Sequence, residues 1–309
     1  MLQHIPVLLA EALDALKVHE GGRYVDATFG RGGHTAAILE RVGKDGGVIA
    51  IDRDPQAIEA GRLRFANEPR LTLVRRSFDR LVEVAAEAGW IGGVDGVLLD
   101  LGVSSPQLDD AARGFSFAQD GPLDMRMDPE RGASAADFVA HASERELVRV
   151  IRELGEERFA KRIARAIVEA RAAAPIKRTS QLAEIAARAV PTREPGKHPA
   201  TRTFQAIRIH VNDELAQLER ALEGALAALA PGGRLAAISF HSLEDGVVKR
   251  FIQKHSQEDP VYAGLPDVPP HARPKLQRIG RAVHPGEAEI AANPRARSAV
   301  MRAAERRGA

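Results

Sequence analysis

Asp100 is the residue of this sequence that is best placed to take part in chemistry. It ends the segment 94–100, where Val97, Leu98 and Leu99 form the unbroken apolar run of a parallel strand covered on both faces. In open α/β sheets, ligands bind just beyond the carboxyl ends of the strands. A carboxylate there can accept hydrogen from a reacting group, or it can only bind the ammonium group of a cofactor.

The segment Asp26–His34 is a second candidate site, because it joins a predicted strand to a predicted helix through a glycine-rich loop. Glycines let the backbone approach a ligand, and a helix N-terminus favours a negative group. The glycines of this loop are Gly30, Gly32 and Gly33. Counted from Gly30, a dinucleotide-binding loop would need glycine where Thr35 stands. The acidic-x-Gly-x-Gly-x-Gly pattern of S-adenosylmethionine enzymes fits better, with Thr28 in its first glycine position.

Two further residues predict a nucleoside site. Asp52 ends the second predicted strand, where a carboxylate can accept both ribose hydroxyls of an adenosine. This role is shared by NAD and S-adenosylmethionine proteins. Phe78 follows the third strand, where an adenine ring would lie, although a core phenylalanine is an equally good interpretation.

Other patterns of catalytic residues are weaker. His241 lies between Ser239 and Ser242, but the Gly-x-Ser-x-Gly motif of hydrolases is absent, so His241 is expected to form a hydrogen-bonding wall of the pocket. The chain has no cysteine and no His-Glu-x-x-His spacing, and no metal site is expected. At Asp100, amino-group DNA methyltransferases carry a polar residue followed by Pro-Pro-aromatic, and only the polar residue is present here.

The elements that position these residues alternate between strand and helix. Strands are predicted over 23–28, 47–52, 71–74 and 94–100, with helices between them, which indicates an α/β fold with a doubly wound parallel sheet. The alternation then stops. A loop over 113–129 and helices over 143–154, 156–171 and 179–190 predict an inserted helical subdomain.

The sheet pattern resumes with a helix that Asn212 is expected to cap, a strand over 234–240 and a helix over 244–254. The last fifty residues are expected to be rich in loops. The expected domains are therefore a discontinuous sheet domain, 1–105 and 211–309, and an inserted helical subdomain, 106–210.

Charge is distributed unevenly along the chain. Its net charge is +2, yet residues 271–309 carry nine Lys and Arg against three Asp and Glu. Such a segment either binds an anionic partner such as nucleic acid or forms a solvated tail. No basic leader and no apolar run long enough to span a bilayer is evident, which favours a cytoplasmic protein.

Taken in order, short motifs along nearly the whole chain resemble those of the bacterial 16S ribosomal RNA cytosine-N4 methyltransferase family, the H-type small-subunit enzymes. The matching segments are 4–11, 26–34, 52–55, 100–107, 113–117, 121–127, 155–160, 198–205, 239–245 and 293–298. The resemblance implies the class I fold of S-adenosylmethionine-dependent methyltransferases. It implies methyl transfer to N4 of a decoding-centre cytidine in 16S rRNA, within the 30S subunit. The oligomeric state is left open between a monomer and a homodimer.

The same resemblance implies the cofactor contacts. In the family, S-adenosylmethionine is contacted by the residues matching Gly32, Gly33, His34, Asp52, Phe78, Asp100 and Gln107. Asp26 and Gly30 are added from the loop pattern above. The helical insertion is implied to help bind RNA.

Asp100 is also the candidate catalytic residue, because the N4 lone pair of cytosine is conjugated and a hydrogen acceptor would make it more nucleophilic. Phe115 or Phe117 could stack on a flipped-out base, or belong to a core. Two alternatives stay open. One is a small-molecule methyltransferase whose insertion is a lid, and the other is a non-catalytic RNA-binding module.

Overall fold

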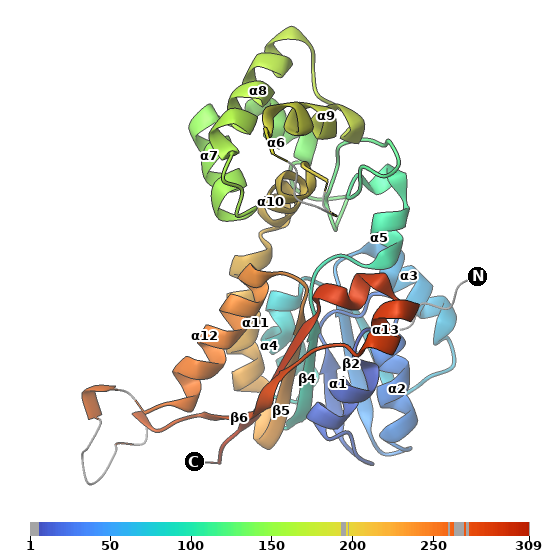
Figure 1. Ribbon diagram of the computed structural model, residues 1–309. Coiled ribbons are helices and arrows are strands. Elements are labelled where there is room, and N and C mark those ends of the chain that lie inside the picture. Colours follow the sequence, from blue (N-terminus) through green and yellow to red (C-terminus); the bar gives the residue numbers. More distant parts are fainter. Residues whose placement is uncertain are drawn as a thin grey trace. The chain divides into compact units, whose positions relative to one another are not determined.

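The computed structural model describes residues 6–192, 196, 198–258, 260–262, 269 and 272–308. The chain forms two compact units, one of residues 1–102 and 215–309 and the other of residues 103–214 (Figure 1). The boundaries expected from the sequence lay at 105/106 and 210/211. Each unit has its own hydrophobic core and is described by itself below.

A seven-stranded sheet forms the centre of the first unit, in the order β3-β2-β1-β4-β5-β7-β6. The first five strands pair in parallel, and β7 is antiparallel to both of its neighbours. The predicted strand–helix alternation and doubly wound sheet are confirmed. The strands are β1 (Arg23–Asp26), β2 (Gly47–Asp52), β3 (Leu71–Arg75), β4 (Val94–Asp100), β5 (Leu229–Ser239), β6 (Leu276–Val283) and β7 (Val300–Arg306).

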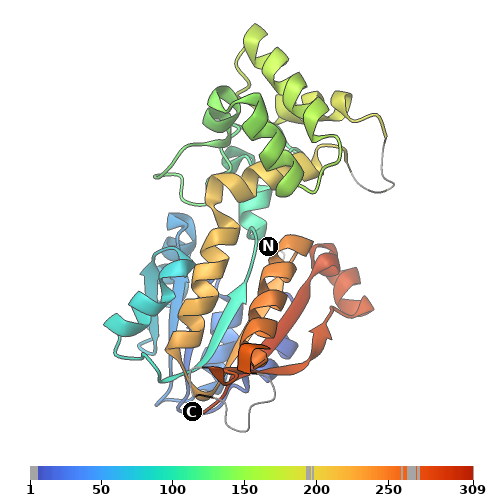
Figure 2. The same ribbon diagram turned by 90° about the vertical axis from the view of Figure 1, so that its left-hand side faces the viewer.

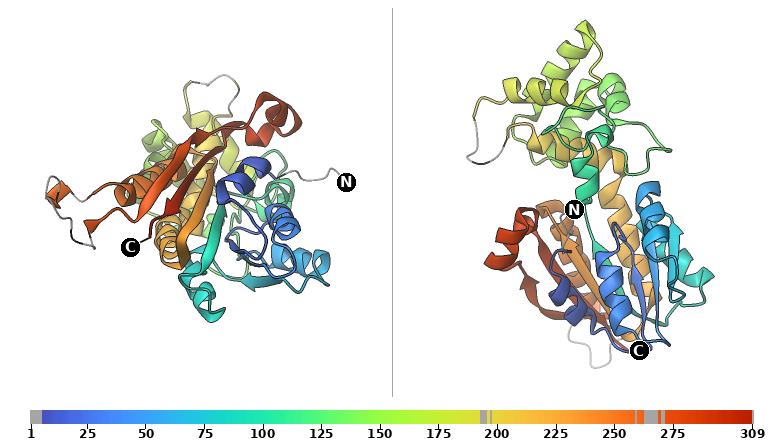
Figure 3. Two further views of the ribbon diagram at one scale, coloured as in Figure 1. Left: turned by 90° about the horizontal axis from the view of Figure 1, so that it is seen from below. Right: turned by 90° about the vertical axis from the view of Figure 1, so that its right-hand side faces the viewer.

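Helices cover both faces of this sheet, which is why its central strands are apolar throughout. One face packs against α4 (Leu81–Glu87), α11 (Glu214–Ala228) and α12 (Ser242–Ser256), which lie together in Figure 2. The other packs against α1 (Leu9–Leu16) and α2 (Gly33–Arg41), on the side seen at the right of Figure 3. Each large apolar side chain buried in this way contributes about 1.5–3 kcal/mol.

Local signals explain where several of these helices begin. The carboxylate of Asp54 accepts the N–H of Gln56, and Pro55 opens α3 (Pro55–Arg64). A short 3-10 turn over Phe78–Arg80 precedes α4. Within the described chain, no helix is both long and apolar enough to cross a membrane.

The prediction of a loop-rich C-terminal segment is wrong. This segment supplies β6, β7 and the short helix α13 (Glu287–Ala292) between them. Arg302 of β7 donates two hydrogen bonds to the carboxylate of Asp245, at 2.6 and 2.9 Å, and the Arg306 guanidinium binds the carbonyl of Leu229. Part of the positive charge that suggested a tail therefore lies in the sheet. The strand was missed because β7 is rich in alanine and charge, which are poor strand signals.

The second unit is helical. Its helices are α5 (Ser105–Asp109), α6 (Ala135–His141), α7 (Glu144–Glu153), α8 (Ala160–Ala173), α9 (Thr179–Ala189) and α10 (Thr201–Asn212). The helix predicted over 143–154 is confirmed as α7, and its N-cap Ser143 accepts the N–H of Glu146. The expectation that α8 begins at residue 156 is wrong. Glu156 has φ of +50°, outside the helical region, and α8 begins four residues later.

Asn212 does not start a helix, which corrects a second expectation. It is the last residue of α10, and its amide donates to the carbonyls of Met125 and Arg208 while its oxygen accepts the N–H of Met127. The break between α10 and α11 lies at Asp213, whose φ of +51° is left-handed. Asn212 therefore fixes the irregular segment 113–129 to a helix, a function that local sequence patterns do not reveal.

Truncation after Gly280 tests the role of the C-terminal segment. It removes β7, which hydrogen-bonds to β5 on one side and to β6 on the other, so we expect loss of cooperative melting by circular dichroism. The control is a full-length variant in which the exposed Arg281, Arg295 and Arg297 become glutamine, which should melt normally. A truncated chain that melts like the full-length protein would show that the segment is a tail.

Candidate active site

Three carboxylates gather at the carboxyl edge of the sheet. Asp26, Asp52 and Asp100 end β1, β2 and β4, and β1 pairs with β2 on one side and β4 on the other. The chain connections run in opposite directions from this point, because β2 and β3 lie to one side and β4 and β5 to the other. Ligands of doubly wound sheets bind at such a switch point.

Asp26 holds the glycine loop in place through hydrogen bonds. Its side chain is 1% exposed, and it accepts a 2.6 Å hydrogen bond from the Thr35 hydroxyl and a 3.2 Å bond from the Thr28 N–H. Burial raises the pKa of Asp26, and these hydrogen bonds oppose that rise. The carboxylate therefore braces both ends of the glycine loop.

The glycine loop has the conformation that its residues require. Gly30 and Gly32 have φ of +56° and +69°, which side chains disfavour. Gly33 is needed for a different reason, because a Cβ there would lie 2.3 Å from Cγ of Pro6. The loop ends at the N-terminus of α2, so backbone N–H groups line the route to the switch point.

Asp52 is tied to the same loop. Its Oδ2 accepts the N–H of Gly30 and its Oδ1 accepts the N–H of Asp54, both at 2.8 Å. Burial raises the pKa of Asp52 to about 6, opposed by these two hydrogen bonds and reinforced by the charges of Asp54 and Asp26. Each carboxylate oxygen has two lone pairs, so both can still accept a ribose hydroxyl.

Thr28 explains a departure from the glycine pattern. Its hydroxyl accepts a 2.6 Å hydrogen bond from the backbone N–H of Asp100, which joins the end of β1 to the end of β4. Glycine at this position could not make that bond. Sequence reasoning identified the departure but not its purpose, which depends on the pairing of β1 with β4.

The two carboxylate oxygens of Asp100 have different surroundings. Its Oδ2 lies 3.6 Å from Nδ1 of the buried His34, whose Nε2 is 3.2 Å from the carbonyl of Val7. Its Oδ1 is buried and has no hydrogen-bond partner among the described residues. Burial raises the pKa of Asp100 to about 6; His34 lowers that pKa, and the charges of Asp26 and Glu244 raise it further.

A buried acceptor without a partner costs about 1–3 kcal/mol, and such atoms call for an explanation. Because Asp100 lies at the ligand-binding edge of the sheet, we explain the missing partner of its Oδ1 by a hydrogen-bond donor that arrives with the ligand. Asp100 can thus accept a hydrogen bond or a proton from a bound molecule.

The turn after β5 completes the carboxyl edge. His241 is the N-cap of α12, where its Nδ1 accepts the N–H of Glu244 at 3.4 Å and its Nε2 lies 3.2 Å from Oε1 of Glu244. The 2%-exposed Glu244 in turn accepts the N–H of Phe240 at 2.8 Å. The sequence analysis assigned no role to Glu244, although Glu three residues after a capping position is a known signal.

The remaining predicted residues lie in different settings. Phe78 is half-buried against the core of the first unit. Gln107 belongs to the second unit, is buried, and accepts the N–H of Ser104 at the start of α5. Phe115 is 6% exposed within the core of the second unit, and Phe117 packs against His198 and Phe204. The core interpretation of Phe115 is therefore the correct one.

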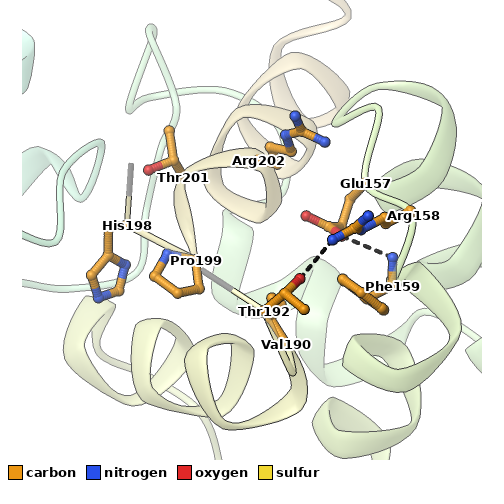
Figure 4. A pocket seen from close by; sticks show the side chains of 9 residues that line it. All are labelled: Glu157, Arg158, Phe159, Val190, Thr192, His198, Pro199, Thr201 and Arg202. Carbon is orange, nitrogen blue, oxygen red and sulfur yellow. Dashed lines mark hydrogen bonds between the residues drawn. The ribbon is translucent and has the colours of Figure 1, made fainter. Parts of the chain in front are cut away.

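The second unit contains a pocket that is open to solvent. Its walls come from the start of α8, the end of α9 and the start of α10 (Figure 4). Arg158 covers the ring of Phe159 at 4.6 Å from the ring centre and donates a 2.6 Å hydrogen bond to Thr192. Arg202 donates to the carbonyl of Glu156 at 3.0 Å. Cationic and aromatic groups together suit nucleic acid.

The sheet order, the glycine loop and the strand-end acids define a class I S-adenosylmethionine-dependent methyltransferase. A family model described as the MraW methylase family matches residues 1–307, and the chain belongs to this family.

Known proteins similar to this chain include a relative of high identity and a solved structure of low identity. The ribosomal RNA small subunit methyltransferase H of Thioalkalivibrio sulfidiphilus (strain HL-EbGR7) is 58% identical over 305 residues, which cover 98% of this chain and 97% of the relative. Among solved structures, an rRNA methylase from Streptococcus thermophilus is 11% identical with a TM-score of 0.45, covering 100% of this chain and 99% of the other. That structural likeness is too low to carry an argument.

Replacing Asp52 by alanine should weaken S-adenosylmethionine binding without unfolding the protein. Losing charge-assisted hydrogen bonds costs about 1.5–3 kcal/mol, so the dissociation constant should rise roughly 10- to 150-fold in calorimetry. Asp95→Ala is the matched control, because Asp95 also accepts a backbone N–H, that of Arg23, but at the other end of the strands. Equal affinity in Asp52→Ala and the wild type would remove Asp52 from the site.

Proposed function

We propose that this protein transfers a methyl group from S-adenosylmethionine to N4 of a cytidine in 16S rRNA, within the decoding centre of the 30S subunit. The chain is an S-adenosylmethionine-dependent methyltransferase of the MraW family, and a relative at 58% identity is named for the small-subunit ribosomal RNA. The observation that carries the proposal is the buried Oδ1 of Asp100 at the ligand-binding edge, which has no hydrogen-bond partner in the part of the chain that the structure describes.

The described residues suit the cofactor. Asp52 would hold the ribose hydroxyls, and the loop from Gly30 to His34 would approach the nucleoside with its backbone. Phe78 and Gln107 are proposed as further contacts, and Asp26 would act by bracing the loop. When bound, the sulfonium supplies an electrophilic methyl group.

Asp100 would supply what the acceptor base needs. The N4 amino group of cytosine donates hydrogen, and its lone pair is delocalised into the ring. A hydrogen bond from N4 to Oδ1 of Asp100 would localise this lone pair and stabilise the positive charge that develops on N4. As the N4–methyl bond forms and the carbon–sulfur bond breaks, Asp100 would take the N4 proton. The products are methylated cytidine and a neutral thioether.

The second unit is proposed to recognise RNA. Arg158 and Arg202 line a solvent-exposed pocket next to Phe159, a combination that fits a phosphate and a stacked base. A small-molecule methyltransferase would have no use for this pocket, which favours the RNA substrate over the alternative. A non-catalytic RNA-binding module is disfavoured because RNA binding alone needs no adenosine site.

The direct experiment incubates 30S subunits that lack the modification with the protein and labelled S-adenosylmethionine. Nucleoside mass spectrometry should then detect N4-methylcytidine in 16S rRNA. Label found only in small molecules, or in another nucleoside, would contradict the proposal.

Asp100→Asn should lower kcat by roughly 100-fold or more, because the amide cannot take the N4 proton. With S-adenosylmethionine saturating, so that titration of Asp52 does not contribute, wild-type kcat/KM for RNA should fall as pH drops below about 6. The value of kcat/KM falls at low pH because a protonated Asp100 can no longer take the N4 proton. This fall at low pH should be absent in Asp100→Asn. Asp95→Asn, on the same strand, is the control. Full recovery of kcat at saturating cofactor would mean that Asp100 only binds it.

Replacing Arg158 and Arg202 by alanine together should weaken RNA binding and leave S-adenosylmethionine affinity unchanged. Each lost phosphate contact should lower the slope of log affinity against log salt by about 0.7 to 0.9. Arg165→Ala is the control, because Arg165 is exposed on the same unit and paired with Glu169 at 2.8 Å. An unchanged salt slope in the double variant would exclude the pocket from the RNA interface.

A further inference from the structure

The first unit has no aromatic residue on the chain directly after Asp100. Leu101 and Gly102 follow it, whereas amino-group DNA methyltransferases place an aromatic residue shortly after the polar group at this strand end. The first aromatic residue downstream is Phe115, which is buried in the core of the second unit. Within the first unit, the stacking partner of a base brought to Asp100 must therefore come from another strand.

Strand register identifies a candidate. Asp100 is paired with Ile238 of β5, and the N–H of Leu101 donates to the carbonyl of Ile238, so the pairing continues past the end of β4. Gly102 then lies across from Phe240. Because side chains alternate along a strand, Phe240 is on the same face of the sheet as Asp100.

Gly102 lies next to the ring of Phe240. Gly102 has no side chain, and a Cβ added to it would lie 3.7 Å from Cδ2 of Phe240. Phe240 itself is only half-buried, with part of its ring packed against the core cluster that includes Ile238 and Met301. Its backbone N–H is held by the carboxylate of Glu244 at 2.8 Å, which fixes the turn that presents the ring.

We propose that Phe240 is the stacking platform for the target cytosine, an inference that rests on the proposed RNA methylation. A base flipped out of RNA loses its stacking neighbours, and an aromatic ring replaces them. A cytosine on the exposed part of the Phe240 ring would extend over Gly102 toward Asp100, which places its N4 edge near the unpaired Oδ1. The platform is thus supplied by β5 in place of β4.

The test separates stacking from mere packing. Binding is measured in the presence of S-adenosylhomocysteine to 30S subunits reconstituted with 16S rRNA that carries either cytidine or an abasic nucleotide at the methylated position. Removal of the base should weaken wild-type binding roughly 5- to 100-fold, the usual effect of one base–aromatic stack. In Phe240→Leu the same removal should change binding less than twofold, and Phe240→Tyr should behave like the wild type.

Trp90→Leu is the matched control, since Trp90 is a half-buried aromatic residue of the same unit that packs near Gly47 at the start of β2. It should keep the full effect of base removal. The inference is overturned if Phe240→Leu also keeps that full effect while its melting temperature and S-adenosylhomocysteine affinity are unchanged. If Phe240→Leu does not fold, Phe240→Met takes its place with the same expectation. Failure of the wild type to methylate 30S subunits would instead overturn the proposed function.

Discussion

The hydrogen bond from the Asp100 N–H to the Thr28 hydroxyl is the interaction on which the site depends. At 2.6 Å it joins the ends of β1 and β4, at the place where the chain connections diverge and no helix crosses between the strands. Thr28 also donates its own N–H to Asp26, and Asp26 holds Thr35 of α2. Cofactor loop and candidate catalytic acid therefore share one support, and a shift of either would move the other.

The three strand-end acids are buried together, and this has an energetic consequence. Burial raises the pKa of each carboxyl group, and the charge of Asp26 raises the pKa of Asp52 and of Asp100 further. Without a ligand, the site thus holds acids that are destabilised relative to water. A cationic or hydrogen-donating ligand at these carboxylates would relieve that cost, so the electrostatics of the site favour binding of such a ligand.

Much of this architecture could be predicted from the sequence, because the first hundred residues carry strong local signals. Unbroken apolar runs, the Asp54 cap with Pro55, and acids at strand ends all depend on near neighbours in the chain. The features that were missed depend on distant partners. Arg302 in β7 is explained by Asp245, and Asn212 by Met125 and Met127, and neither pairing is visible in a local pattern.

The site shows the same division. Asp52 and Asp100 became candidates from their strand-end positions alone, whereas the contacts of Thr28 and Glu244 required knowledge of which strand ends and turns are adjacent. The interpretation of the C-terminal segment as a solvated tail is wrong for a related reason. Counting arginines measures their total charge, but Arg302 and Arg306 are already engaged by a carboxylate and a backbone carbonyl within the sheet.

The position of β7 between β5 and β6 also bears on how the protein is made. In the finished sheet Ser239 is paired with Val300, so roughly 60 residues must be synthesised after β5 before its second edge is covered. At about 5–20 residues per second, that edge stays exposed for about 3 to 12 s on each nascent chain. During this interval β5 presents free backbone groups to any other unfinished strand. Newly made copies on one messenger RNA are thus most prone to mispairing in the interval between the synthesis of β5 and that of β7, and the pairing of β7 closes this exposed edge.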